Sequence, residues 1–355
     1  MSEEEQVVIH GLVCPRPLAH DETVVLGHGS GGRMTFDLIT KTFYPPFSNP
    51  TLLRGDDAAV VERPEEGKLA VSTDAHIVAP LFFPGGDIGR LSVAGTVNDL
   101  VCMGAQPLWL TASFILEEGL PLYVLQAALE SMKSTAEEAG VQIIAGDTKV
   151  AERGKADGIF ISTTGVGRIP PGRDVHGANA KVGDVVLVSG TLGDHGLAVL
   201  AARGELGFEA QIRSDVAPLH GLVEAIFAVS TDIHVLRDPT RGGLATTLNE
   251  IARQSGVCIE IEETMIPVDP SVEAACEMLG FDPLYVANEG KLVVIVGAGD
   301  ADVVEAAMRD HPYGTGTKRI GVVCEAPERR VLMKTGIGGT RVVDVLSGEL
   351  LPRIC

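Results

Sequence analysis

Basic residues are scarce in this sequence. It contains 28 lysines and arginines against 48 aspartates and glutamates, which gives a net charge of −20. Nucleic-acid backbones and anionic membranes would repel such a chain, so both are excluded as partners. No apolar run approaches the roughly 18 residues of a membrane span. The opening MSEEEQ lacks a basic segment followed by an apolar one, so we expect no signal peptide and a cytoplasmic protein.

Closely spaced cysteines are also missing. The chain has 6 cysteines and no C-x-x-C pair, at Cys14, Cys102, Cys258, Cys276, Cys324 and Cys355. In a cytoplasmic chain of this length, that spacing excludes a disulfide framework and a zinc site. The four from Cys102 to Cys324 lie in apolar stretches and are predicted core thiols. Cys14 is expected in a loop.

Short β-rich runs alternate with helical ones, which predicts α/β or α+β layers. The sequence predicts strands at 68–73, 108–116, 141–147 and 157–169, and helices at 87–104 and 121–140. With 355 residues, two domains are expected. Breakers after residue 169 place their boundary near Pro170.

The first chemical signal is the placement of aspartates. Asp74 and Asp147 each follow the apolar run of a predicted strand, and Asp56 and Asp57 precede another apolar stretch. In open α/β sheets, ligands bind outside the carboxyl ends of strands, so these acids are predicted to converge on one crevice. Asp99 lies inside a largely apolar helix, where a carboxylate is costly unless it is paired or binds a metal.

Such a set of carboxylates with few lysines nearby favours a hard cation together with a polyphosphate, because magnesium bridges acids to phosphates. For each aspartate taken alone, a cap or turn residue is the simpler interpretation. The sequence has no G-x-x-x-x-G-K-[ST], so a nucleotide would not be held by a P-loop. GHGSGG matches G-x-G-x-x-G, but no clean strand precedes it, so a dinucleotide fold is not predicted.

DPTRGG, from Asp238 to Gly243, couples an acid and an arginine to a predicted helix start. Backbone amides there can meet an anion, although a plain helix cap is the alternative. The chain ends in LLPRIC. The terminal carboxylate raises the pKa of the adjacent Cys355 thiol, and this cysteine is either incidental in a frayed tail or a thiol on a tether.

Taken together, these motifs resemble those of the hydrogenase expression/formation protein HypE family. They occur in its order: HGSGGR, GDDAAV, STDAHI, NDL, AGDTKV, GDHG, DPTRGG, NEG and the terminal PRIC. The broader superfamily comprises aminoimidazole ribonucleotide synthetase, selenophosphate synthetase and thiamine-monophosphate kinase. The resemblance covers roughly residues 27–355.

The resemblance implies a two-domain aminoimidazole ribonucleotide synthetase-like fold of the α/β (α+β) class with a flexible C-terminal tail. It divides the chain into an N-terminal extension (1–26), an ATP-binding domain (27–169), a C-terminal α/β domain (170–340) and a tail (341–355). A homodimer formed through the N-terminal domains is expected on the same ground.

The implied activity is that of an ATP-hydrolysing carbamoyl dehydratase. The carbamoyltransferase HypF would load a carbamoyl group onto Cys355. ATP-dependent dehydration would convert this S-carboxamide into a thiocyanate, whose cyanide goes to iron on a HypC–HypD complex for [NiFe] hydrogenase.

The resemblance also implies residue roles. Cys355 would be the carrier thiol, and Lys149 and Glu289 the acid/base candidates, with His195 and Asn98 close to the reacting groups. Thr148 is a further ATP-binding candidate. Magnesium and the ATP phosphates would be held by Asp57, Asp74, Asp99, Asp147 and Asp238. For Lys149, Glu289 and His195, the alternatives are a surface or phosphate-binding lysine, a salt bridge and a turn hydrogen bond.

Two other functions remain open at this point. A small-molecule kinase or synthetase of the same superfamily would not need the tail. A non-catalytic ATP-binding scaffold for metal-centre assembly would bind ATP without turnover.

Overall fold

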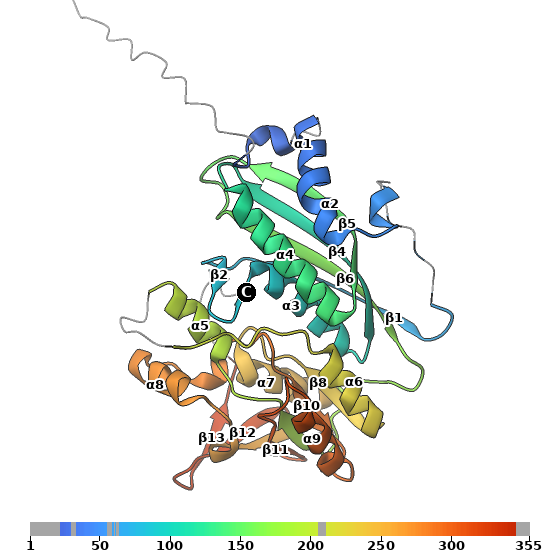
Figure 1. Cartoon of the computed structure of the whole chain (residues 1–355). Helices are drawn as coiled ribbons and strands as arrows, with labels where there is room; N and C mark the ends of the chain where they lie inside the picture. Colours follow the sequence, from blue (N-terminus) through green and yellow to red (C-terminus); the bar gives the residue numbers. More distant parts are fainter. Residues whose placement is uncertain are drawn as a thin grey trace, which may run out of the picture.

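A computed structural model describes residues 22–29, 33–54, 59, 61, 64–204 and 211–345. These residues form two layered domains (Figure 1). The N-terminal domain is built on a four-stranded sheet in the order β1–β6–β4–β5. Its strands are β1 (Lys68–His76), β4 (Gln106–Glu117), β5 (Gln142–Ala151) and β6 (Ile159–Ile169). β6 runs antiparallel to β1 and β4, and β5 is parallel to β4.

One face of this sheet is covered by α3 (Ile88–Cys102) and α4 (Leu122–Ala139). β4 alternates accordingly, with Leu110, Ala112, Phe114 and Leu116 buried. Asp87 caps α3 by accepting hydrogen bonds from the backbone amides of Gly89 and Arg90, as expected for an N-cap aspartate.

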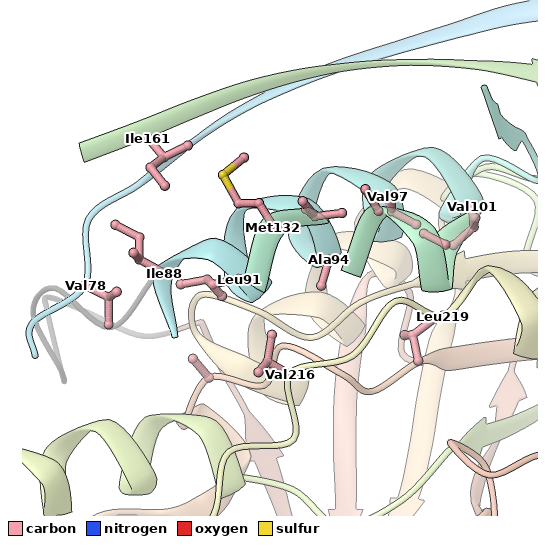
Figure 2. Close-up of a cluster of buried hydrophobic side chains, with 14 of the residues drawn as sticks. Val78, Ile88, Leu91, Ala94, Val97, Val101, Met132, Ile161, Val216 and Leu219 are labelled. Atoms are coloured by element: carbon pink, nitrogen blue, oxygen red, sulfur yellow. The ribbon is translucent and has the colours of Figure 1, made fainter. Parts of the chain in front are cut away.

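The helix α3 is buried on nearly all sides because it lies between the two domains. Figure 2 shows its side chains between Ile161 and Met132 of the N-terminal domain and Val216 and Leu219 of the second domain. A largely apolar sequence without a single polar face is typical of such a buried helix. The two domains therefore share one continuous hydrophobic cluster.

Short helical segments precede the first sheet. They are η1 (Leu26–Gly29), α1 (Arg33–Leu38), the π-helical turn η2 (Ile39–Phe43), α2 (Tyr44–Phe47) and η3 (Leu52–Arg54). η1, α2 and η3 lie against β5. The strands β2 (Phe82–Phe83) and β3 (Gly86–Asp87) form a small hairpin before α3.

The C-terminal domain contains a seven-stranded sheet in the order β13–β12–β9–β11–β7–β10–β8. Its strands are β7 (Val185–Val188), β8 (Ile233–Arg237), β9 (Cys258–Glu262), β10 (Val293–Val296), β11 (Lys318–Cys324), β12 (Arg330–Lys334) and β13 (Thr340–Val343). The helices are α5 (Asp194–Ala202), α6 (His220–Val229), α7 (Gly243–Ser255), α8 (Pro270–Leu279) and α9 (Ala301–Asp310), with the 3-10 turns η4 (Glu263–Met265) and η5 (Pro283–Tyr285).

Hydrophobic packing assigns these helices to the two faces of the second sheet. Leu244, Leu248 and Ile251 of α7 cluster with Val186 and other side chains of one face. Helices α6 and α9 pack with side chains of the opposite face, such as Leu187 and Val294. The sheet is thus covered on both sides, which explains its apolar strands.

Several elements differ from the sequence predictions. β1 does not end near Thr73 but continues to His76, and β5 continues past Asp147 to Ala151. β8, β2 and β3 were not predicted. Cys102, Cys258 and Cys276 are buried as expected, whereas Cys324 is partly exposed. Across the described ranges, no helix is both long and apolar enough to cross a membrane.

Candidate active site

A pocket between the two domains is lined by Glu250 and four further acidic side chains. Asp74 comes from β1, Asp99 from α3, Asp238 from the loop after β8 and Glu289 from the loop before β10. The rest of the lining is Thr73, Gly95, Arg237, Thr240, Arg241, Thr246 and Thr247. Three of the predicted aspartates therefore meet here, together with one of the predicted acid/base residues.

The reason for this convergence differs from the predicted one. Asp74 lies within β1, which pairs antiparallel with β6, so it is not at the carboxyl end of a parallel strand. It alternates along the strand with Ser72 and His76 and faces α3, where Ser72 Oγ donates a hydrogen bond to Asp99 Oδ2 at 2.6 Å. Asp74 and His76, which follow the predicted end of the strand, therefore belong to the helix-facing side of β1.

Burial disfavours the charged form of Asp99, Asp238 and Glu289. It raises the pKa of Asp99 to about 6, with a further contribution from the neighbouring Asp238. Burial likewise raises the pKa of Asp238. For Glu289, which is 4 % exposed, burial and the charge of Asp238 raise the pKa well above its usual range. The pocket thus holds acids whose negative charge is incompletely compensated.

His76, which was not a predicted site residue, lies beside Asp74 but does not line the pocket. It is 1 % exposed, and its Nε2 lies 3.8 Å from Asp74 Oδ2. Burial lowers its pKa. A Cβ at Gly95 would lie 3.0 Å from the His76 ring and 3.5 Å from Asp74 Oδ2, so this glycine makes room for both. The alternation Ser72, Asp74, His76 is the signal that could have identified His76.

Asp147, Thr148 and Lys149 do not line this interdomain pocket. They line a second, largely apolar pocket with Gly29, Thr35, Ile39, Phe43, Tyr44, Phe47, Leu52, Ala112, Phe114, Ile143, Ala145 and Gly146. Lys149 Nζ lies 2.9 Å from Asp147 Oδ2, and its hydrogen bond lowers the pKa of that carboxyl.

Strand register explains this separation. Asp74 on β1 pairs with Thr163 on β6. Thr163 pairs with Ala112 on β4, and Ala112 pairs with Gly146 on β5. Asp147 instead pairs with Ser113, one residue further on. Since successive residues point to opposite faces of a sheet, Asp74 faces the helices, and Asp147 faces the side that no described helix covers. Within one chain, the predicted aspartates therefore form two groups.

His195 and Asn98 line neither pocket. His195 is fully buried at the start of α5, with Nδ1 2.8 Å from Ser214 Oγ and its ring edge-on to Phe83. Asn98 Nδ2 donates hydrogen bonds to the carbonyls of Ala217 and Glu289, and its Oδ1 accepts one from the Leu219 amide. Asn98 thus connects α3 to two loops of the other domain.

Two predicted site residues, Asp57 and Cys355, lie outside the described residues, as does Cys14. Among the residues that are described, no three His, Cys, Asp or Glu side chains are close enough together to hold a metal ion. The predicted ligand set for magnesium remains a prediction.

Comparison with known proteins defines the class first. Residues 55–169 match the family "AIR synthase related protein, N-terminal domain", and residues 181–334 match its C-terminal counterpart. The chain is therefore a two-domain protein of the AIR synthase-related fold, as predicted.

Closer relatives define the family within this class. Carbamoyl dehydratase HypE of Cupriavidus necator is 58% identical over 330 residues, which are 93% of this chain and 94% of that protein. A crystal structure of hydrogenase maturation protein HypE in complex with ATP is 48% identical, with a TM-score of 0.90 over 94% of this chain and 100% of that one. A HypE–HypF complex structure gives 49% identity and a TM-score of 0.77 over 87% of this chain and 99% of that one. The chain belongs to the carbamoyl dehydratase HypE family, an enzyme family of hydrogenase maturation.

Proposed function

We propose that this chain uses ATP to dehydrate a carboxamide carried on the thiol of its own Cys355, and so produces a thiocyanate. The observation that supports this most strongly is the interdomain pocket containing Asp74, Asp99, Asp238 and Glu289 in a member of the carbamoyl dehydratase family. HypF is the proposed carbamoyl donor, because a relative forms a HypE–HypF complex. A HypC–HypD complex is the proposed acceptor of the cyanide.

The chemistry requires ATP because an amide oxygen is a poor leaving group. Transfer of the γ-phosphoryl group to the carboxamide oxygen makes that oxygen part of a phosphate. Breaking the C–O bond then releases phosphate and leaves S–C≡N. The carboxamide nitrogen loses both its protons, one during phosphorylation and one as the C–O bond breaks. The protein's main task in such a transfer is to position the groups and balance their charge.

Glu289 is the better-supported base for the second proton. It shares the pocket with three aspartates, and burial raises its pKa, which makes its carboxylate a stronger base than an exposed one. Lys149 remains a second candidate. Within one chain it lies in the other pocket, beside Asp147.

The acids of the interdomain pocket suit a hard cation that is shared with phosphate, although no three of the described acids are close enough to hold it alone. Carboxylate oxygens are the ligands that magnesium prefers, with phosphate oxygens and water completing its shell. Burial raises the pKa values of Asp99 and Asp238, and a bound cation would favour their charged forms. We assign Asp74, Asp99 and Asp238, with Asp57 and Asp147 as further candidates, to magnesium and the ATP phosphates. Bound magnesium would offset the charge of the phosphoryl group being transferred.

We also propose that the chain forms a homodimer through the uncovered face of its first sheet. Leu69, Val71 and Ile115 on this face are 53%, 68% and 45% exposed. Exposed apolar side chains gathered on one face are typical of an interaction surface. Asp147 faces the same side, so the dimer would cover the sheet beside the second pocket.

The role of the terminal thiol can be tested by ATP hydrolysis in the presence of HypF and carbamoyl phosphate. The Cys355→Ala variant should lose the part of ATP hydrolysis by this chain that depends on carbamoyl phosphate, because it has no thiol to carry the substrate. The matched Cys324→Ala variant should retain it. Equal hydrolysis by both variants would favour a free small-molecule substrate.

A further inference from the structure

Glu289 is held by side chains that do not line the pocket. Asp215 Oδ1 accepts a hydrogen bond from the Glu289 amide at 3.2 Å, and Asp215 Oδ2 accepts one from the Gly290 amide at 3.2 Å. On the other side, Asn98 Nδ2 donates to the Glu289 carbonyl at 3.2 Å. The peptide groups on both sides of Glu289 are therefore fixed, one of them from the opposite domain.

Asp215 is itself held by a buried ion pair. Its side chain is 2% exposed, and Lys291 Nζ lies 3.6 Å from its Oδ2. The same Nζ lies 3.4 Å from Asp194 Oδ2, which also accepts a hydrogen bond from Thr191 at 2.5 Å. A buried carboxylate is tolerated only when it is paired and hydrogen-bonded. Lys291 supplies the pairing, and the Glu289 loop supplies two of the hydrogen bonds.

The loop also approaches the Asp215 backbone closely. A Cβ at Gly290 would lie 1.8 Å from the Asp215 carbonyl oxygen, so only glycine permits this contact. Asn288 fixes the loop from the preceding position, with its Oδ1 accepting from the Gly193 amide and its Nδ2 donating to the Pro239 carbonyl. These contacts leave the Glu289 backbone little freedom to move.

We propose that Asp215, paired with Lys291, is a positioning residue that holds the Glu289 carboxyl in the geometry needed for proton removal. This inference rests on the proposed function. A base must lie within hydrogen-bond reach of the proton that it removes, and a displacement of about 1 Å can cost about 100-fold in rate. Neither Asp215 nor Lys291 lines the pocket, so both would act through Glu289.

The test is the Asp215→Asn variant, which keeps the shape of the side chain but has a single acceptor oxygen. One of the two loop amides then loses its partner. We expect turnover of the dehydration to fall about 10- to 100-fold, while the KM for ATP stays within about twofold. Loading of Cys355 by HypF should be unchanged. Hydrogen exchange of the peptide spanning residues 286–292 should become faster.

Asp184→Asn is the matched control. Asp184 is a buried aspartate of the same domain; it accepts a hydrogen bond from the Lys181 amide and lies 2.7 Å from His234 Nδ1. This control should retain turnover and normal exchange at residues 286–292. Equal losses of turnover in the two variants would overturn the proposal, as would unchanged loop exchange in Asp215→Asn.

Lys291→Gln decides the question if Asp215→Asn does not fold. It leaves the hydrogen bonds but removes the pairing charge, so we expect the same pattern with a smaller loss of turnover. Normal turnover and exchange in this variant would contradict the proposal. If the unmodified protein shows no ATP-dependent dehydration, the proposed function fails. The exchange measurement still decides whether Asp215 and Lys291 hold the loop.

Discussion

At the scale of single residues, the interdomain pocket concentrates negative charge at a cost to stability. Asp99 shows this most clearly, because it is an acid within a buried helix and its pKa is raised to about 6. The folded-state pKa lies above the value of about 3.9 expected in the unfolded chain. Its ionised form therefore destabilises the fold above about pH 6, and this penalty disappears as the pH falls towards about 4.

Replacing Asp99 by asparagine should accordingly stabilise the protein while impairing its chemistry. In the absence of nucleotide and magnesium, Asp99→Asn should increase the free energy of unfolding by about 1–3 kcal/mol at about pH 8. The gain should shrink at about pH 5, because Asp99 is then largely protonated in the wild type. ATP-dependent dehydration should fall at least about tenfold if Asp99 binds magnesium.

Chemical denaturation at the two pH values measures this effect. Asp174→Asn serves as the control, because Asp174 is exposed and lies outside the pocket. A decrease in stability of Asp99→Asn at about pH 8 would show that the carboxylate is compensated in the folded state, contrary to the charge imbalance inferred here.

At the scale of elements, one face of the β1–β6–β4–β5 sheet carries exposed apolar side chains that no described element of the same chain covers. Val71 is its most exposed large apolar side chain on β1, at 68%. Its cross-strand neighbour on β6 is Val166. Because the opposite face is covered by α3 and α4, the proposed dimer accounts for the apolar residues of this one.

A charge placed on this face should separate the proposed dimer. We expect Val71→Asp to have the mass of a monomer by size-exclusion chromatography with light scattering, because a buried unpaired carboxylate opposes association. Val303→Asp, at a position 48% exposed on α9, should retain the mass of a dimer. If the unmodified protein has the mass of a monomer, the dimer proposal is wrong.

The sequence predicted the helices α3 and α4 well because both carry clear terminal signals. Gly140 closes α4 in a left-handed conformation, as its place after the last apolar turn indicated. The sequence misplaced the end of β1, because the strand was predicted to end near Thr73 although Asp74 and His76 continue its face towards α3. The alternation shows that these side chains share one face of a strand, but it does not show which helix that face contacts.

The candidate site was predictable to the extent that its residues lie in motifs. Asp99, Asp238 and Glu289 carried such signals, and the structure brings them together with Asp74 in one pocket. The separation of Asp147 from this group was not predictable. It depends on the strand register, in which a shift of one residue moves a side chain to the opposite face of the sheet. Asp215 carried no signal, since its role arises from backbone contacts that only the folded loop creates.

At the scale of the whole molecule, the proposed activity requires both a pocket between two domains and a thiol at the end of the chain. The helix α3 connects the two domains through Asn98. The pocket that would use ATP is assembled from both domains, with Asp74 and Asp99 from one and Asp238 and Glu289 from the other. Integrity of the domain junction is therefore a condition of the proposed activity.

The most direct test of this account is the mass of the C-terminal peptide. The protein is incubated with HypF, carbamoyl phosphate and ATP, and a parallel sample is transferred, once loaded, to a non-hydrolysable ATP analogue. We predict a carbamoyl adduct on Cys355 in both samples, which loses one water only where ATP is hydrolysed. An unmodified peptide in the presence of active HypF, or loss of water without ATP hydrolysis, would contradict the account.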